Sequence, residues 1–210
     1  MRIATWNLEA KSTPAHEEFL TGLRADVLLL TEVHADTEAD ARSAEAMALG
    51  QACAAIRGAQ MTSTQSAWSA AGVRAGVTFL SSVLPHRAAG ENQGRSTVAR
   101  VEELDRCWPE GDVVWGGDWN HELEGRLLAG SKEGRTAILA LLASRGLVCP
   151  TALLAAKRGE RSVNHVVVPK TWSIVSAAVV GCGSLSDHDA YVVEVRRPGE
   201  VSDLAPEWPI

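Results

Sequence analysis

The stretch VVWGGDWN at residues 113–120 decides the fold class of this 210-residue chain. Three apolar residues that favour a strand lead through Gly116 and Gly117 into Asp118 and, two residues later, Asn120. A strand that ends in a carboxylate and an amide is typical of α/β folds, in which ligands collect at the carboxyl ends of strands.

The same arrangement occurs elsewhere along the chain. One early apolar run leads into Asn7, a second leads into Glu32, and Asp187 and His188 precede the last apolar run. If these strands are neighbours, their polar ends converge on one point. Taken singly, each of these residues is typical of a turn or an exposed loop. The joint pattern favours a site.

Seven apolar runs rich in β-branched residues predict strands, and four segments with helical spacing predict helices. Strands alternate with helices early in the chain and cluster late, where too few helices remain to cover them. We therefore expect an α/β sandwich of four layers, with two mixed sheets packed face to face and flanked by helices. The expected strands are residues 3–6, 27–30, 77–83, 113–115, 163–168, 174–180 and 191–195, and the expected helices are 14–23, 38–56, 97–107 and 132–143, the last with Ser131 as N-cap and Gly146 beyond its end.

Composition indicates one globular domain over residues 1–197, followed by an extended tail at 198–210. The chain is 46% apolar and 22% charged, which suffices for one sizeable core. No run approaches the roughly 18 apolar residues of a membrane helix, and the first residues lack the pattern of an export signal. We therefore expect a cytoplasmic protein without a membrane partner.

Charge and cysteine content exclude two further classes. The net charge of −6 does not favour strong clamping of duplex DNA by a basic face, so a phosphate ligand would need a metal or local arginines. The four cysteines are far apart and form no CxxC pair, which argues against a zinc ribbon or a disulfide framework. We expect them to be small buried thiols.

Tryptophan is unusually frequent, with seven residues against two Phe and one Tyr. Trp6, Trp115 and Trp119 lie beside the polar strand ends. A Trp can wall a pocket and offer its N–H to a ligand, so we expect these three near the site.

The polar residues have the chemistry of a phosphoryl-transfer site. Carboxylate and amide oxygens are hard ligands for Mg²⁺, which takes one or two carboxylates together with water and phosphate oxygens. An Asp and a nearby His supply an acid/base pair, and Asn120 can donate to a phosphoryl oxygen.

Five motifs follow one another along the chain, and they are IATWNLE at 3–9, DVLLLTE at 26–32, GGDWN at 116–120, SVNHV at 162–166 and LSDHDA at 185–190. In this order they resemble the endonuclease/exonuclease/phosphatase superfamily, which includes exonuclease III-like nucleases and pancreatic-type DNases. The resemblance implies a four-layer sandwich and a divalent metal, Mg²⁺ or Mn²⁺, held mainly by Glu32 with Asn7 and Asp187 close by.

The same resemblance implies the catalytic roles. Asp118 would activate the attacking water, Asn120 would bind the scissile phosphate, and His188 would stabilise the transition state. The substrate would be a phosphoester, either a nucleic acid or a small phosphoester.

One departure from the family pattern concerns the partner of His188. Family members usually have Asp at the position of Asn164. An amide can accept a hydrogen bond from the imidazole but cannot stabilise imidazolium by charge. In a serine protease the corresponding change lowers turnover by roughly 10⁴-fold, so reduced activity is a live alternative.

A second departure lies at the end of the 77–83 run. Many relatives place a catalytic Tyr or His there, whereas this chain has Val83 and Leu84. His86 and Arg87, just beyond, are candidates to reach the same phosphate, or they are ordinary loop residues.

Three hypotheses follow. The first is a metal-dependent phosphodiesterase, acting on nucleic acid or on a small phosphoester, by base-activated water. The second is a binding or scaffold protein that has kept the fold while catalysis has weakened. The third is a structural protein whose strand-end acids only form turns, which scattered motifs would favour.

Overall fold

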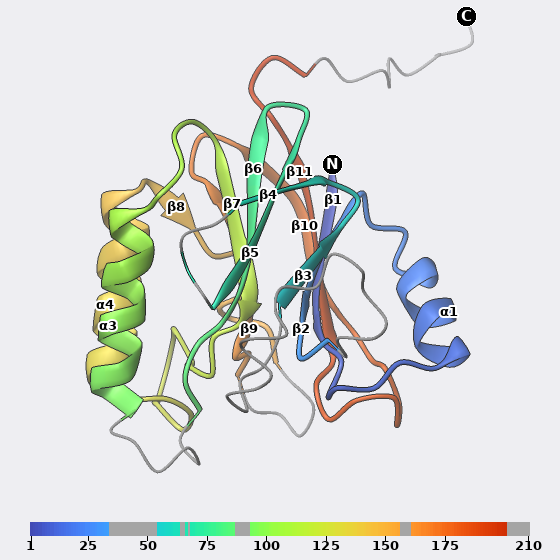
Figure 1. Cartoon of the computed structure of the whole chain (residues 1–210), viewed down its shortest axis with the longest axis horizontal. Helices are drawn as coiled ribbons and strands as arrows, with labels where there is room; N and C mark the ends of the chain where they lie inside the picture. The colour runs from blue at the N-terminus through green and yellow to red at the C-terminus, as the bar shows by residue number, and fades with distance from the viewer. Residues whose placement is uncertain (34–53, 64–65, 67, 87–92, 156–160, 201–210) are drawn as a thin grey trace, which may run out of the picture.

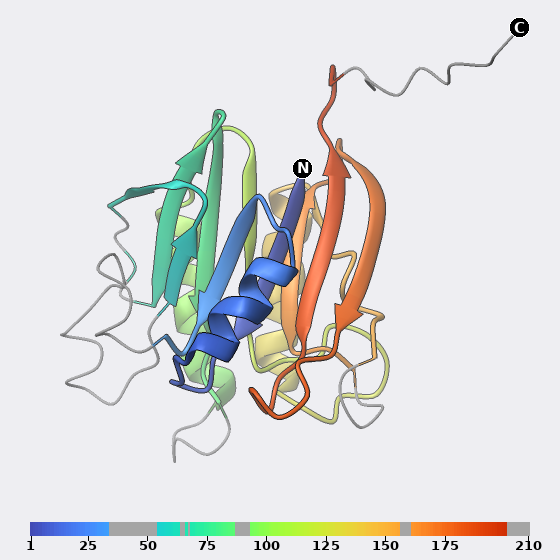
Figure 2. The same cartoon turned by 90° about the vertical axis from the view of Figure 1, so that its right-hand side faces the viewer.

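The computed structural model describes residues 1–33, 54–63, 66, 68–86, 93–155 and 161–200. Two β-sheets pack face to face, and helices cover their outer faces, in four layers (Figures 1 and 2). This is the α/β sandwich that the sequence predicted.

The first sheet has five strands in the order β10-β11-β1-β2-β3. Its centre is the parallel pair β1 and β2, in which Asn7 lies opposite Thr31, and the other pairs are antiparallel. The strands are β1 (Arg2–Asn7), β2 (Val27–Thr31), β3 (Ala54–Arg57), β10 (Ser173–Val180) and β11 (Ala190–Arg196).

The second sheet has six strands in the order β4-β5-β6-β7-β9-β8. Its parallel pair, β6 and β7, places Val83 opposite Asp118, and the antiparallel pair β7 and β9 places Asp118 opposite Asn164. The strands are β4 (Gln60–Thr62), β5 (Ser69–Arg74), β6 (Val77–Val83), β7 (Val113–Asp118), β8 (Leu147–Val148) and β9 (Asn164–Pro169).

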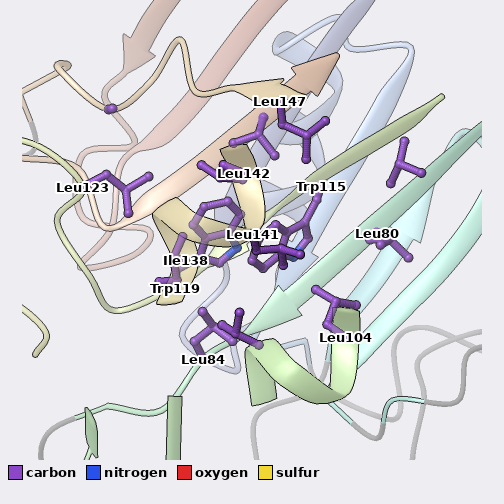
Figure 3. Close-up of a cluster of buried hydrophobic side chains, with 14 of the residues drawn as sticks. Leu80, Leu84, Leu104, Trp115, Trp119, Leu123, Ile138, Leu141, Leu142 and Leu147 are labelled. Atoms are coloured by element: carbon purple, nitrogen blue, oxygen red, sulfur yellow. The ribbon is translucent and has the colours of Figure 1, made fainter. Parts of the chain in front are cut away.

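Helices cover the outside of each sheet. Helix α1 (Pro14–Gly22) buries Leu20 against the first sheet, in a cluster that includes Trp6. Helices α3 (Gln93–Arg106) and α4 (Lys132–Ser144) lie side by side on the second sheet. Figure 3 shows the core beneath them, formed by the side chains of Leu80, Leu84, Leu104, Trp115, Trp119, Leu123, Ile138, Leu141, Leu142 and Leu147.

The two sheets approach closely at the GGDWN motif. A Cβ on Gly116 would lie 2.7 Å from Leu29 Cδ1 of the facing sheet and 2.6 Å from the His165 carbonyl oxygen. Gly117 has φ +125°, and a Cβ there would collide with the main chain of Ser82 on β6. Both positions therefore require glycine, because a side chain would push neighbouring strands apart.

Most predicted elements are confirmed, but one helix is wrong in part. Residues 54–56, expected at the end of a helix, belong to β3, which pairs antiparallel with β2 and packs Ile56 into the core between the sheets. Alanine-rich sequence favours a helix, but pairing with a buried strand overrides that propensity. Residues 38–53 of the expected helix lie outside the described residues.

Other boundaries differ by a few residues. Strand β7 continues through the glycines to Asp118, and α3 begins at Gln93. Strands β4, β5 and β8 were not predicted. Ser131 caps α4 as expected, because its Oγ accepts a hydrogen bond from the Gly134 N–H at 3.0 Å.

The termini and cysteines add little to the site. Of the expected tail, residues 201–210 lie outside the described residues, and so does Cys53. Cys182 is buried, Cys107 and Cys149 are half-buried, and all three are free thiols.

None of the described helices has the length and apolar character needed to span a membrane.

Candidate functional site

The predicted site residues gather where the parallel strands of both sheets end. Asn7 is the last residue of β1 and Asp118 the last of β7, and the Asn7 Nδ2–H donates to Asp118 Oδ2 at 2.9 Å. This buried hydrogen bond joins the two sheets at one edge of the sandwich. The motifs are therefore not scattered, and the purely structural hypothesis loses its main support.

Asp118 lies at the centre of this edge. Its Oδ1 accepts from the Asn120 N–H at 3.0 Å, which is the Asx turn expected of such a sequence, and Oδ2 accepts from Asn7. His188 Nε2 lies 3.9 Å from Oδ2, too far for a hydrogen bond. The Asp118 side chain is 2% exposed and that of His188 is 22% exposed, so solvent reaches this pair from the His188 side.

The loop that carries His188 is held to the first sheet and to α1 by buried and partly buried hydrogen bonds. The Trp6 Nε1–H donates to the His188 carbonyl oxygen at 2.9 Å, and Ser186 Oγ donates to the Asn7 carbonyl oxygen at 2.7 Å. His16 of α1 contacts the Leu185 carbonyl oxygen through Nε2 at 3.0 Å. These contacts fix the imidazole beside Asp118.

Asn164 contacts His188 as the motif implies. The Asn164 Nδ2 atom lies 2.6 Å from His188 Nδ1, whereas Asn164 Oδ1 is buried and has no hydrogen-bond partner among the described residues. In this orientation the amide donates to Nδ1, so the neutral imidazole carries its proton on Nε2, toward Asp118. With the amide reversed, Oδ1 would accept from Nδ1–H and the other tautomer would form.

Residues Asn120 and Glu32 both have left-handed backbones, with φ +51° and +49°. This region is uncommon for residues other than glycine, and such residues often lie at functional sites. The Asn120 Nδ2–H donates to the Leu84 carbonyl oxygen at 2.9 Å, so part of this amide is already engaged by the protein. Its contact with a phosphate stays a prediction.

The three predicted metal ligands come from neighbouring segments. Asn7 Oδ1 accepts from the Glu9 N–H at 2.8 Å, which fixes the oxygen side of the amide. Glu32 follows β2 directly and is half-buried, and no hydrogen bond or ion pair joins its carboxylate to another described residue. Asp187 is exposed, with Oδ1 3.8 Å from His188 Nε2.

The donor atoms suit a Mg²⁺ or Mn²⁺ ion that keeps most of its water ligands, rather than an ion enclosed entirely by protein ligands. Two carboxylates and one amide oxygen are donors that Mg²⁺ accepts while it keeps several waters. Within the described ranges, no group of three or more His, Cys, Asp or Glu side chains is arranged to hold a metal. The assignment of Glu32, Asn7 and Asp187 therefore rests on donor type and position.

Sequence reasoning gave no role to Glu9, which the structure places at the same edge. Glu9 Oε2 accepts from the Asp187 N–H at 3.2 Å and from Lys11 Nζ at 2.7 Å. The Lys11 hydrogen bond lowers the pKa of Glu9. The available signal was its spacing, since a carboxylate two residues after Asn7 lies beyond the same strand end.

The end of β6 has the aliphatic residues noted in the sequence. Val83 lies opposite Asp118, and the Leu84 side chain packs in the core under α3 and α4. The Leu84 N–H donates to the Asp118 carbonyl oxygen at 2.9 Å. The exposed His86 follows Leu84 by two residues, so its position in the chain brings it near the site. The role of His86 stays a prediction, and Arg87 lies outside the described residues.

The three tryptophans expected near the site lie in the core beside it, and two of them donate their N–H groups within the protein. Trp6, Trp115 and Trp119 are fully buried. The Trp6 N–H bonds to His188 and the Trp115 N–H to Ser82 Oγ, and the Trp115 and Trp119 rings stack 3.9 Å apart. They support the site from within the core.

His165, in the fourth motif, is part of that core. Its Nε2–H donates to the His121 carbonyl oxygen at 2.9 Å, and its ring packs against Trp119. Burial lowers the pKa of His165 to about 4, and burial also lowers the pKa of His121. Both imidazoles are therefore neutral in the folded protein at pH 7.

We expect His165 to make the fold sensitive to acid. Unfolding returns its pKa to about 6.5, so below that pH the unfolded chain binds a proton that the folded chain refuses. Stability is complete above pH 6.5 and falls as the pH drops toward 4, by about 3 kcal/mol from this residue alone. Urea unfolding at pH 7 and pH 4.5 measures the loss. His165→Asn should flatten the difference, whereas His86→Asn, an exposed control, should not.

Comparison with known proteins supports the fold. The sequence matches no protein-family model and no curated protein. Among solved structures, the endonuclease domain of TRAS1, a telomere-specific non-LTR retrotransposon, is similar with a TM-score of 0.59 and 15% sequence identity. The match covers 94% of this chain and 99% of that one. The chain therefore shares the fold of this endonuclease domain, an α/β sandwich of two mixed sheets flanked by helices, as its sequence predicted.

Proposed function

We propose that this protein is a phosphoesterase, dependent on Mg²⁺ or Mn²⁺, that hydrolyses a phosphodiester by attack of a base-activated water. The observation that supports it best is the buried carboxylate of Asp118, oriented by Asn7 and by the Asn120 main chain, with His188 Nε2 3.9 Å away. A carboxylate and an imidazole this close together are suited to take a proton from water and to stabilise charge on phosphate.

In this mechanism each protein group has one task. Asp118 accepts the proton of the attacking water through Oδ2 as the water oxygen bonds to phosphorus. The ester P–O bond breaks on the opposite side, and the leaving oxygen takes a proton from solvent. His188 Nε2–H donates to a phosphoryl oxygen as negative charge develops there, and Asn120 orients the phosphate. Glu32, Asn7 and Asp187 would hold the metal, which when bound polarises the phosphoryl group.

Two substrate classes stay open within this proposal. The TRAS1 neighbour is an endonuclease domain, which favours nucleic acid. The net charge of −6 provides no general attraction for a polyanion, which favours a small phosphoester. Hydrolysis of supercoiled plasmid and of bis-p-nitrophenyl phosphate, each with Mn²⁺ and with EDTA, tests both. If neither substrate is cleaved in a Mn²⁺-dependent manner, the proposal is contradicted.

We expect Asn164→Asp to raise turnover. The new carboxylate accepts from His188 Nδ1–H and adds a negative charge that stabilises imidazolium. The gain should be at least several-fold and at most about 10⁴-fold, the effect of the reverse change in a serine protease. The kcat for bis-p-nitrophenyl phosphate measures it, with circular dichroism to confirm the fold. An unchanged or lower rate would show that His188 does not act through this pair.

A binding or scaffold protein is the second candidate. The family resemblance implies a catalytic Asp where this chain has Asn164, which contacts His188. It also implies a catalytic Tyr or His at the end of β6, where this chain has Val83 opposite Asp118. On this reading the chain would bind a phosphodiester in the presence of Mn²⁺ without cleaving it, and Asn164→Asp would not restore cleavage. Binding of a non-hydrolysable phosphodiester, measured beside turnover, separates the two candidates.

A further inference from the structure

A buried histidine that lies in none of the five motifs joins helix α1 to the loop with His188. His16 is the third residue of α1, which lies against the first sheet (Figure 2), and it is 3% exposed. Its Nε2 atom lies 3.0 Å from the Leu185 carbonyl oxygen, and its Nδ1 atom lies 2.8 Å from Thr13 Oγ1. Both ring nitrogens are therefore engaged, although the proposed mechanism gives His16 no task.

These two partners determine how the His16 ring is protonated. A carbonyl oxygen can only accept a hydrogen bond, so Nε2 carries a proton and donates it to Leu185. In the neutral ring Nδ1 then has a free lone pair, and the Thr13 hydroxyl donates to it. Rotation of the ring by half a turn would break both bonds, so together they fix its orientation.

Thr13 makes this contact instead of capping its helix. It occupies the N-cap position of α1, but its side chain makes no cap hydrogen bond. An N-cap Thr ordinarily accepts a hydrogen bond from the main-chain N–H of the second or third helical residue, which stabilises the helix. Departures from such local rules are expected at functional sites. The use of the hydroxyl to orient His16 therefore favours a role for this ring beyond the stability of α1.

The His16 ring also supports the loop through Trp6. The two rings stack with their centroids 5.5 Å apart and their planes 26° apart. The Trp6 Nε1–H donates to the His188 carbonyl oxygen at 2.9 Å. His16 therefore acts on both ends of the segment 185–188, at Leu185 directly and at His188 through Trp6.

We propose that His16 is a positioning residue, which places His188 beside Asp118 through the main chain of residues 185–188. This inference rests on the proposed function, because it assigns His16 to the same site. His16 is buried, so it acts through the loop and not by contact with substrate. A displacement of ~1 Å caused by a change far from the reacting atoms can lower the rate about 10²-fold. The Ser186 hydrogen bond to the Asn7 carbonyl oxygen keeps the loop attached when His16 is changed, so the expected effect is a shift of the loop and not its loss.

Amide side chains separate the two contacts of His16. In His16→Gln the amide nitrogen extends to the place of Nε2 and can donate to Leu185, whereas in His16→Asn it extends only to the place of Nδ1. His16→Leu makes neither contact. We expect kcat for bis-p-nitrophenyl phosphate to fall ~10- to 100-fold in His16→Leu and His16→Asn with KM nearly unchanged, and to be largely restored in His16→Gln.

Two other variants of α1 complete this series. Thr13→Val keeps the buried ring and the shape of the side chain but removes the hydroxyl, so kcat should fall by a smaller factor than in His16→Leu. Glu17→Gln is the matched control, because the Glu17 carboxylate joins α1 to Arg57 of β3, at 2.7 and 2.9 Å, instead of to the loop. It loosens the attachment of α1 and should have the wild-type kcat.

NMR spectra of the imidazole groups test the placement of His188 without any turnover. The His188 ring signals should shift in His16→Leu and return toward their wild-type positions in His16→Gln. If the wild-type protein cleaves no phosphodiester, the proposed function fails, and these shifts alone decide whether His16 places His188. Wild-type kcat in a folded His16→Leu variant overturns the proposal, and so do unshifted His188 signals. An equal loss in His16→Leu and His16→Gln, or the same loss in Glu17→Gln, also overturns it, because the bond to Leu185 would then not be the cause.

Discussion

Asp118→Asn should lower kcat for phosphodiester hydrolysis by about 10²- to 10⁴-fold and leave KM nearly unchanged. The amide cannot accept the proton of the attacking water, so the chemical step loses its base. Metal binding should change little, because Asp118 is not among the proposed ligands. The kcat and KM for one substrate, together with Mn²⁺ titration by calorimetry, measure these effects.

The structure provides the controls for this variant. The amide keeps one acceptor oxygen, so it can retain the hydrogen bond to Asn7 or to the Asn120 N–H but not both. Its stability should therefore fall by about 1 kcal/mol without unfolding. Asp105→Asn, at an exposed ion pair with Arg145, makes the same chemical change away from the site and should have wild-type kinetics. An Asp118→Asn enzyme with wild-type kcat cannot be using Asp118 as its base.

Glu32→Gln should remove most metal-dependent activity and weaken Mn²⁺ binding at least ~10-fold. Changes to residues that only support metal ligands typically cost about 10- to 100-fold in affinity or activity, so loss of a direct carboxylate ligand should cost no less. Because the amide has nearly the same shape, the left-handed backbone at Glu32 and the fold should be retained. Calorimetric titration with Mn²⁺ measures the binding directly.

Two further variants show which carboxylate binds the metal. Glu133→Gln, in the exposed first turn of α4, is the matched control and should bind Mn²⁺ as the wild type does. Glu9→Gln tests the residue that sequence reasoning left without a role, since Glu9 lies beside Asp187. Unchanged Mn²⁺ binding in Glu32→Gln, with a loss in Glu9→Gln, would transfer the main ligand role from Glu32 to Glu9.

The layers of the fold were predictable because the spacing of apolar residues along the sequence indicates which segments are buried. Strands β1, β2, β6, β9 and β11 lie within a residue or two of the apolar runs, since a strand buried between layers must be apolar along its length. Strand β10 also matches its apolar run, although its residues are exposed or half-buried. The segment 54–56 was not predictable in the same way. Its alanines favour a helix, and only pairing with β2 makes it a strand.

The convergence of the polar strand ends was also predictable from the sequence, but the contacts between their side chains were not. Asn7 and Asp118 each end a strand, so the sequence predicted that they converge. It did not predict that the Asn7 amide donates to Asp118 or that Lys11 engages Glu9, because side-chain partners depend on atoms brought together from distant segments.

The sequence by itself therefore determined the α/β class, the order of most strands along the chain and the polar groups at their ends, because these depend on local periodicity and on residue type. Only the tertiary structure decided which groups touch. It placed the Asn7 amide against Asp118 and left β10 as a long uncharged edge, since contacts between segments far apart in the chain, and the edges of a sheet, exist only once the sheets have formed.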